Sequence, residues 1–182
     1  MRKIKLFIAL SLDGYIAGPG DDLSFLSRFE GEDFGHAEFS ETIDTYIVGR
    51  RTYDVVMQIA GNFSAVHQYE HCYVVTRHEL PDQDGVFYQG DVVELARQLK
   101  AQPGKDIYCD GGAQIIKALM QEGLVDEFTM FVMPVFLGEG IRLFPGGIPE
   151  TELELLGIQS YGNGAVKLKY QLKSLSTGSG MN

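Results

Sequence analysis

The chain has 182 residues, of which 45% are hydrophobic and 22% are charged, and its formal net charge is −10 at pH 7. This length suffices for one domain with a sizeable core. The acidic balance and the lack of a basic run argue against nucleic acid and anionic membranes as partners.

The cysteines and the chain ends add three expectations. Cys72 and Cys109 are far apart and form no CxxC motif, so the sequence predicts neither a metal site nor a disulfide framework. The N-terminal apolar run is too short to span a membrane and lacks a cleavage site, which favours a cytoplasmic protein. Residues 174–182 are rich in Ser and Gly, and we expect them to form a flexible tail after a single domain, residues 1–173.

The first predicted element is a buried strand over residues 4–10, and a turn-rich loop over residues 11–20 follows it. Active-site loops often follow the first strand of an α/β domain, which makes Asp13 a candidate functional residue. The alternative, which we favour for Asp13 taken alone, is a plain turn in which its carboxylate bonds its own backbone.

A helical pattern over residues 33–43 comes next, and a short strand over residues 46–48 precedes a helix over residues 52–60. The sequence GRRT, residues 49–52, lies between that strand and the second helix. Guanidinium groups beside a helix N-terminus offer a fork that fits a phosphate, whereas two solvated surface arginines are the alternative.

The next strand, residues 71–76, ends in a hydroxyl and a cation, Thr76 and Arg77. A brief strand over residues 86–88 and a helix over residues 92–99 follow. The strand over residues 71–76 therefore also has polar side chains, a hydroxyl and a cation, at its carboxyl end.

A strand, a glycine turn, a helix and a further strand follow within about 30 residues, the size of a βαβ unit. Residues 107–109 lead through Asp110 into Gly111-Gly112, a helical pattern runs until Gly123, and an apolar run covers residues 128–137. Two glycines at such a turn let backbone N–H groups approach an anion at the helix N-terminus. The alternative is a tight turn that binds nothing.

Residues 153–160 and 165–172 predict two strands joined at Gly162-Asn163-Gly164, a sequence with the turn chemistry of a hairpin. The elements together predict an α/β fold with a mostly parallel sheet, helices on its faces and an antiparallel hairpin at the C-terminus. Ligands of such sheets bind at the carboxyl ends of the strands, and four strands end there in polar or glycine residues. A dinucleotide site is therefore favoured, although the GxGxxG fingerprint is absent.

Four motifs in this order resemble a known family: SLDGYIA, IVGRRTYD, YVVTR, and DGGAQIIKALMQEGLVDEF with MPVFLGEGIRLF. The chain is similar, from about residue 3 to residue 172, to the dihydrofolate-reductase-like superfamily. It resembles most the reductase domain of the bifunctional riboflavin-biosynthesis deaminase-reductase. The resemblance implies a three-layer α/β/α sandwich around a central mixed, mostly parallel sheet, and it implies NADPH as the cofactor.

The same resemblance implies which residues hold the cofactor. The first loop would line the nicotinamide, the GRRT segment and the glycine pair would meet the phosphates and ribose, and the end of strand 71–76 would read the 2′-phosphate. The residues are Ala9, Ile16, Gly18, Gly49, Arg50, Arg51, Thr52, Thr76, Arg77, Gly111, Gly112, Ala113, Gln114 and Ile115.

The catalytic carboxylate is a separate prediction, because hydride transfer needs a polarised acceptor. Folate reductases use a carboxylate on the first helix, and the resemblance implies Asp33 at that place. Asp33 as a simple helix cap is the alternative, and Asp13 is a second, weaker candidate.

The resemblance also implies a substrate, the ribosylaminopyrimidine 5-amino-6-(5-phosphoribosylamino)uracil, and a pterin such as dihydrofolate is the alternative. The chain has no tryptophan and no zinc-deaminase signature, which weakens a strict dihydrofolate assignment and leaves out the deaminase half. A non-catalytic NADPH-binding protein and a structural oligomerising domain are the competing classes. The long apolar run over residues 128–137 favours a homodimer.

Overall fold

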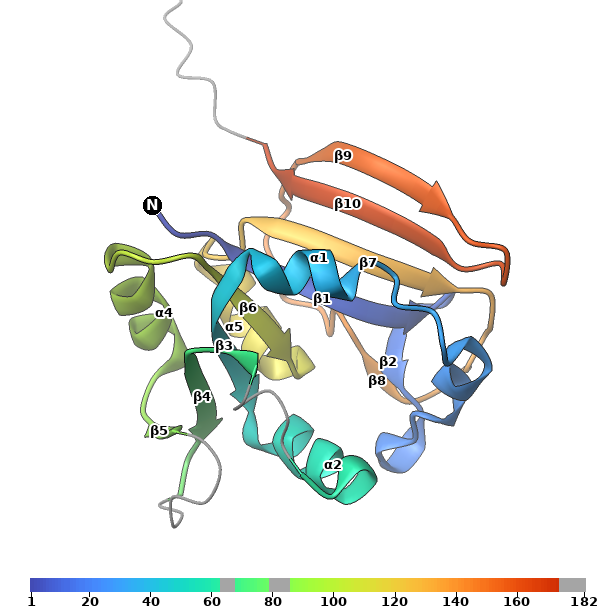
Figure 1. Ribbon diagram of the computed structural model, residues 1–182, viewed down its shortest axis with the longest axis horizontal. Coiled ribbons are helices and arrows are strands. Elements are labelled where there is room, and N and C mark those ends of the chain that lie inside the picture. The colour runs from blue at the N-terminus through green and yellow to red at the C-terminus, as the bar shows by residue number, and fades with distance from the viewer. Residues whose placement is uncertain (63–67, 79–85, 174–182) are drawn as a thin grey trace, which may run out of the picture.

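The computed structural model describes residues 1–62, 68–78 and 86–173, so the predicted tail, residues 174–182, lies outside the described residues. Eight strands form one sheet in the spatial order β5-β4-β3-β6-β1-β7-β10-β9, with the hairpin β9–β10 at one end (Figure 1). The strands are β1 (Ile4–Ser11), β3 (Ile43–Gly49), β4 (His71–Thr76), β5 (Val86–Gln89), β6 (Asp106–Gly111), β7 (Glu127–Met133), β9 (Leu153–Ser160) and β10 (Val166–Leu172).

The sheet is mixed and mostly parallel, as predicted. All neighbours from β5 to β7 pair in parallel, whereas β10 runs antiparallel to β7 and to β9. A small second sheet pairs β2 (Tyr15–Ala17) with β8 (Ile141–Arg142). The carboxyl ends of β1, β3, β4, β6 and β7 therefore lie at one edge of the main sheet.

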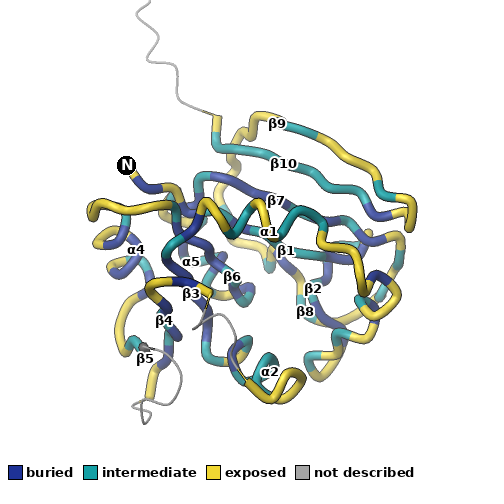
Figure 2. Tube along the Cα trace, viewed as in Figure 1, coloured by how far each residue is buried: buried dark blue, intermediate teal, exposed yellow. Residues whose placement is uncertain are grey.

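Helices cover both faces of the sheet and make the three layers that were predicted. They are α1 (His36–Glu41), α2 (Arg50–Ala60), α4 (Val92–Ala101) and α5 (Ala113–Gln121), with two 3₁₀ turns, η1 (Pro19–Asp21) and η2 (Ser24–Phe29). One core joins α4 and α5 to the sheet, and the opposite face packs against η2, α1 and α2. Burial is concentrated in the central strands, while β9 is largely exposed (Figure 2).

Alternation along β1 shows why this strand lies at the centre. Ile4, Leu6 and Leu10 belong to the core under α4 and α5, whereas Phe7 and Ala9 belong to the opposite core. Successive side chains of a strand point to opposite faces, so a strand that is apolar on both is buried on both.

The predicted bounds of three elements were wrong. The helix predicted over residues 33–43 is only α1, because Phe34 and Gly35 have positive φ angles of 54° and 83° that no right-handed helix allows. The strand predicted from residue 46 already begins at Ile43, and the strand predicted to residue 137 ends before Pro134, which has no N–H for the ladder. The hairpin, and the bounds of β4, agree with the prediction.

Candidate functional site

Two neighbouring strands, β3 and β6, run directly into helices at the carboxyl edge of the sheet. β3 passes through Gly49 into α2, and β6 passes through Gly111 and Gly112 into α5. A Cβ atom on Gly49 would lie 3.1 Å from the side chain of Ile115, and one on Gly112 would lie 3.1 Å from Oγ1 of Thr52. The two turns are thus packed against each other at a distance that side chains would prevent.

The N-termini of α2 and α5 both lack a side-chain cap. By contrast, the carboxylate of Asp91 accepts hydrogen bonds from the N–H groups of Val93 and Glu94 at the start of α4. Uncapped N–H groups and the helix dipole favour an anion, and here two such helix ends adjoin. The Gly111–Gly112 peptide is cis, and Gly111 has a φ of +95°. Because neither glycine has a side chain, the turn presents main chain.

The arginines predicted to meet phosphate lie on the first turn of α2 and have carboxylate partners. Nε of Arg50 donates to Asp54 at 2.6 Å, and Nε of Arg51 lies 2.9 Å from Asp21 of η1. Arg51 keeps 69% of its side chain exposed. Each guanidinium has five N–H donors, so these contacts leave donors for a phosphate.

Thr76 and Arg77 lie at the end of β4, next to β3 on the same edge. The Thr76 hydroxyl is buried, and it both donates to and accepts from the backbone of His78 at 3.2 Å. Arg77 is exposed and forms no ion pair with any described residue. The cation, rather than the hydroxyl, is therefore available to a ligand.

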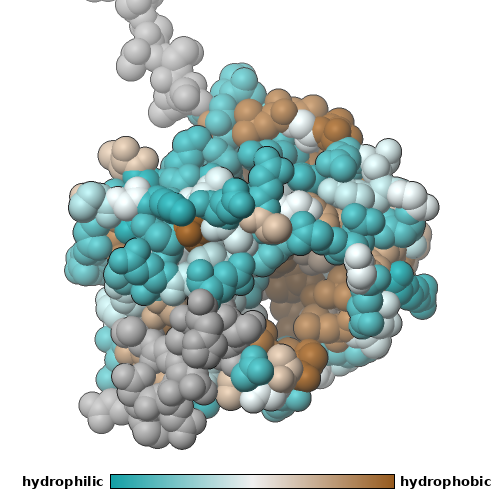
Figure 3. Space-filling view, viewed as in Figure 1, coloured by the Kyte–Doolittle hydropathy of each residue, from teal (hydrophilic) through white to brown (hydrophobic). Residues whose placement is uncertain are grey.

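Main-chain pairing between β1 and β6 ends before the two strands reach this edge, which leaves a gap in the sheet. Their pairing comprises only Ile4 with Ile107 and Lys5 with Tyr108, whereas β1 continues along β7 as far as Ser11. Beyond the last pair, the Tyr108 hydroxyl donates to the carbonyl of Phe7 at 3.0 Å. A hollow with apolar atoms in its wall lies between α1, α2 and β2 (Figure 3).

Three residues were predicted to line the nicotinamide. Ala9 lies in β1, Ile16 lies in β2, and Gly18 directly follows β2. The neighbouring segment crosses closely, because a Cβ atom on Gly140 would lie 2.1 Å from the carbonyl oxygen of Ala17. These residues lie on the β1 side of the gap between β1 and β6, opposite the glycines of β3 and β6.

A cavity of about 220 Å³ lies beside β1 and β7 on the face covered by η2 and α1. It is lined by Phe7, Ala9, Leu26, Phe29, Glu30, Asp33, Phe34, Phe131 and Met133. Asp33 lies in this lining, and its Oδ2 also accepts the N–H of Ala37 at 3.3 Å. Both interpretations of Asp33, pocket carboxylate and helix cap, describe its position.

Asp13, the second carboxylate candidate, has a mainly structural set of partners. It accepts hydrogen bonds from the hydroxyl of Ser11 at 2.5 Å and from the N–H groups of Leu137 and Gly138. These donors, the Ser11 hydroxyl above all, lower the pKa of Asp13 to about 2. A carboxyl group that is ionised at neutral pH is a poor proton donor, so this geometry does not favour Asp13 as the acid.

Asp110 is a candidate that was not recognised from the sequence. Its carboxylate accepts the hydroxyls of Tyr46 at 2.5 Å and Tyr108 at 2.7 Å, and the second of these also bonds Phe7 of the cavity wall. Burial raises the pKa of Asp110, although the two hydroxyls and the charge of His36 oppose that rise. The available signal was an Asp directly before the glycine pair with a Tyr two residues earlier on the same strand face.

Among the described residues, no group of His, Cys, Asp and Glu side chains is arranged to hold a metal ion. Cys72 and Cys109 are buried free thiols, and burial raises the pKa of each to about 12. No helix in the described ranges is long and apolar enough to cross a membrane.

Comparisons with known proteins agree with this fold. Residues 2–167 match the family described as the RibD C-terminal domain. The uncharacterized protein YwjB of Bacillus subtilis is 39% identical over 172 residues, which cover 93% of this chain and 97% of the relative.

Two solved structures extend the comparison. A putative riboflavin biosynthesis protein from Shewanella sp. PV-4 has a TM-score of 0.82 and 27% identity, over 94% of this chain and 99% of the other. A pyrimidine reductase-like protein from Corynebacterium diphtheriae shares the fold, with a TM-score of 0.67, 13% identity, and 94% and 92% coverage. The chain belongs to the family of RibD C-terminal domains.

Proposed function

We propose that the chain is an NADPH-dependent oxidoreductase that reduces a small heterocyclic molecule. One observation carries the proposal. The uncapped N-termini of α2 and α5 lie next to each other at Gly49, Gly111 and Gly112, beside the gap between β1 and β6. Membership of a family of reductase-like domains supports the chemistry.

The residues present fit a dinucleotide phosphate. The close turns at Gly49 and Gly112 would hold a pyrophosphate between the two helix ends, because the uncapped N–H groups there favour an anion and glycine leaves the main chain accessible. Arg50 and Arg77 would bind the 2′-phosphate of the adenosine half, and Ala9 and Ile16 would contact the nicotinamide half. When bound, NADPH would supply the hydride, and the chain would supply position and a proton.

Two carboxylates are our candidates to supply that proton. Asp33 lies in the wall of the cavity. Asp110 lies at the end of β6, and burial raises its pKa so that the acid form persists to higher pH than for a solvated carboxyl group. A buried carboxyl group that stays protonated can donate a hydrogen bond to a substrate, and we propose Asp110 for this role alongside Asp33.

The finer substrate proposal comes from the relatives. One solved neighbour bears the name of a riboflavin biosynthesis protein and another that of a pyrimidine reductase-like protein. We therefore propose a pyrimidine or pterin-like ring, with 5-amino-6-(5-phosphoribosylamino)uracil and dihydrofolate as the two compounds to assay. The cytoplasmic location, and the absence of nucleic-acid and membrane partners, stay predictions.

Calorimetric titration with NADPH and NADH tests the cofactor proposal. Arg77→Ala should weaken NADPH binding about 10- to 100-fold and leave NADH binding unchanged, because one charge-assisted hydrogen bond to the 2′-phosphate contributes about 1.5–3 kcal/mol. Arg97→Ala is the matched control, since Arg97 is an exposed cation of α4 that pairs with Glu122. Equal losses for the two cofactors would remove Arg77 from the 2′-phosphate site, and no binding of either would overturn the proposal.

Turnover separates the enzyme from a non-catalytic NADPH-binding protein. Oxidation of NADPH with either candidate substrate, followed by its absorbance, is expected for an enzyme. Tight NADPH binding with neither compound reduced would favour a binding protein or a different acceptor.

A further inference from the structure

The cavity beside β1 and β7 has a wall of aromatic rings in contact with one another. Phe131 lies at the centre, with its ring centroid 4.6 Å from that of Phe7 and 5.2 Å from that of Phe34. Phe29 adds a fourth ring to the lining. Such a wall presents flat apolar faces, which are complementary to a planar ring.

Phe34 is held in this wall at a conformational cost. Its φ of 54° is an outlier for a bulky residue, so the surrounding contacts must hold the backbone in this conformation. Tyr161 holds it from the other side: the two ring centroids are 4.8 Å apart, and the Tyr161 hydroxyl donates to the carbonyl of Phe34 at 3.3 Å. The contacts around Phe34 therefore keep its ring on the cavity.

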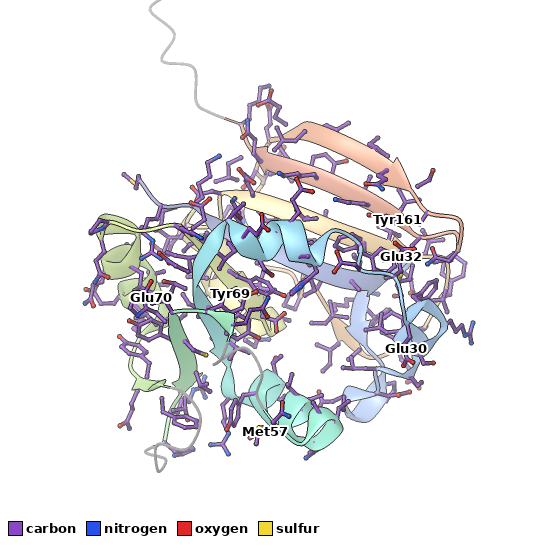
Figure 4. All side chains as sticks on the ribbon, in the orientation of Figure 1. Glu30, Glu32, Met57, Tyr69, Glu70 and Tyr161 are labelled. Atoms are coloured by element: carbon purple, nitrogen blue, oxygen red, sulfur yellow. The ribbon has the colours of Figure 1, made fainter. Side chains whose placement is uncertain are left out.

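The polar groups of the lining are two carboxylates, Glu30 and Asp33, and no lining residue is a cation. Glu32 adds a third acidic group to the same segment, and Figure 4 shows Glu30, Glu32 and Tyr161 on the same side of the molecule. Burial first, and then the charges of Glu32 and Asp33, raise the pKa of Tyr161. Glu30, Glu32 and Asp33 are exposed, so their charges lie at or beside the mouth of a cavity whose lining is otherwise apolar.

Cations lie near the cavity but outside its lining. The ammonium of Lys167 is 6.0 Å from the centroid of Phe131, and His36 meets the ring of Phe7 at 5.4 Å between centroids. Arg28 is an exposed residue of η2. A phosphate in the cavity itself would meet two carboxylates and four aromatic faces, none of which stabilises an anion.

We propose that this cavity selects a flat heterocycle that carries a positive charge, such as a ring with a protonated imine, and that any phosphate of the same compound stays outside the lining. The proposal rests on the proposed function, because it takes the cavity as the seat of the group to be reduced. Aromatic faces attract cations, and the carboxylates of Glu30 and Asp33 add to that attraction. The cavity of about 220 Å³ has room for a ring system, and it opens to solvent, so a substituent of that ring can extend past the lining.

Calorimetry with simple probes tests the charge preference. N-methylquinolinium is a flat cation, and quinoline is its neutral counterpart at mildly alkaline pH. The cation should bind about 10-fold more tightly, which corresponds to about 1.4 kcal/mol. Naphthyl phosphate should bind more weakly than naphthol, since the phosphate adds only repulsion. Equal binding of the cation and the neutral ring, or tighter binding of the phosphate, would overturn the proposal.

Variants assign the preference to the lining. Glu30→Gln and Asp33→Asn should each reduce the advantage of the cation and leave quinoline binding unchanged, and Asn at position 33 keeps an oxygen for the N–H of Ala37. Phe34→Leu should weaken both probes. Glu38→Gln removes an exposed carboxylate of α1 outside the lining and should change neither. A full cation preference in the Glu30→Gln and Asp33→Asn variants would place the discrimination elsewhere.

NADPH affinity, measured on the same protein samples, distinguishes failure of the cavity proposal from failure of the proposed function. Normal NADPH binding without a cation preference would contradict the cavity proposal alone. A cation preference that Glu30→Gln and Asp33→Asn abolish, in a protein that does not bind NADPH, would support the cavity proposal and overturn the proposed function.

Discussion

Asp110 should make the stability of the protein fall as pH rises. Burial raises its pKa, so the folded protein binds this proton more tightly than the unfolded chain does. The free energy of unfolding therefore decreases as pH rises from the ordinary carboxyl range through the raised pKa. Urea unfolding across mildly acidic pH should show this decrease for the wild type and lose it in Asp110→Asn. An unchanged pH dependence in the variant would mean that Asp110 titrates normally.

Asp13 should act with the opposite sign. Its pKa is lowered to about 2 from a usual value of 3.8, with the hydrogen bond from Ser11 as the largest cause. The stabilisation is present above the unfolded-state pKa and is lost as pH falls through that range toward 2. Asp13→Asn should be less stable than the wild type at neutral pH, and the difference should shrink in acid. A difference that stays constant with pH would contradict a role for the charge.

At the scale of elements, the packed turns after β3 and β6 make a prediction about glycine. Gly49→Ala and Gly112→Ala should each weaken NADPH binding at least about 10-fold, because each methyl group would come within 3.1 Å of the facing turn. Gly162→Ala, in the β9–β10 turn, is the matched control, since a Cβ atom there meets nothing within 4 Å. Calorimetric titration measures the three affinities. Equal affinities would mean that the cofactor does not contact these turns.

Elements with a strong local signal could be predicted from the sequence, and those that depend on distant contacts could not. His71–Thr76 is apolar between polar neighbours, and the hairpin has its own turn chemistry, so both agree with the structure. The helix predicted from residue 33 failed because Phe34 adopts a left-handed conformation that contacts with Tyr161 maintain.

The residues of the candidate site also differ in how far the local sequence reveals them. Gly49, Gly111 and Gly112 are visible in a motif because glycine itself is the requirement. The carboxylate of Asp110 contacts Tyr108, two residues earlier, and Tyr46, a residue of β3 that is 64 positions away in the chain. The local sequence shows the first partner and not the second.

For the whole molecule, the homodimer stays a prediction. The run over residues 128–137 contributes β7, which lies inside the sheet between β1 and β10, and beyond that strand Phe136 is 73% exposed. A group of exposed apolar side chains lies on the end strand β9, where Leu155 is 48% and Ile158 is 64% exposed. An apolar patch at the sheet end is visible in Figure 3. We propose β9 as the contact surface.

Light scattering coupled to size-exclusion chromatography measures the assembly. The wild type should elute with the mass of a dimer, and Ile158→Glu should shift it to a monomer, because a charge would be buried in an apolar contact. Gln159→Glu is the control, since neighbouring residues of a strand point to opposite faces. A monomeric wild type would end the dimer prediction.

The short pairing of β1 with β6 also affects how the centre of the molecule can adjust. Main-chain hydrogen bonds hold neighbouring strands about 4.7–4.9 Å apart, but here they stop after Lys5 and Tyr108. Beyond these residues, a side-chain hydrogen bond from the Tyr108 hydroxyl to the carbonyl of Phe7 connects the two strands. The width of the gap is thus set by replaceable side-chain contacts, so a ring inserted there can be accommodated without breaking the ladder that holds each half of the sheet.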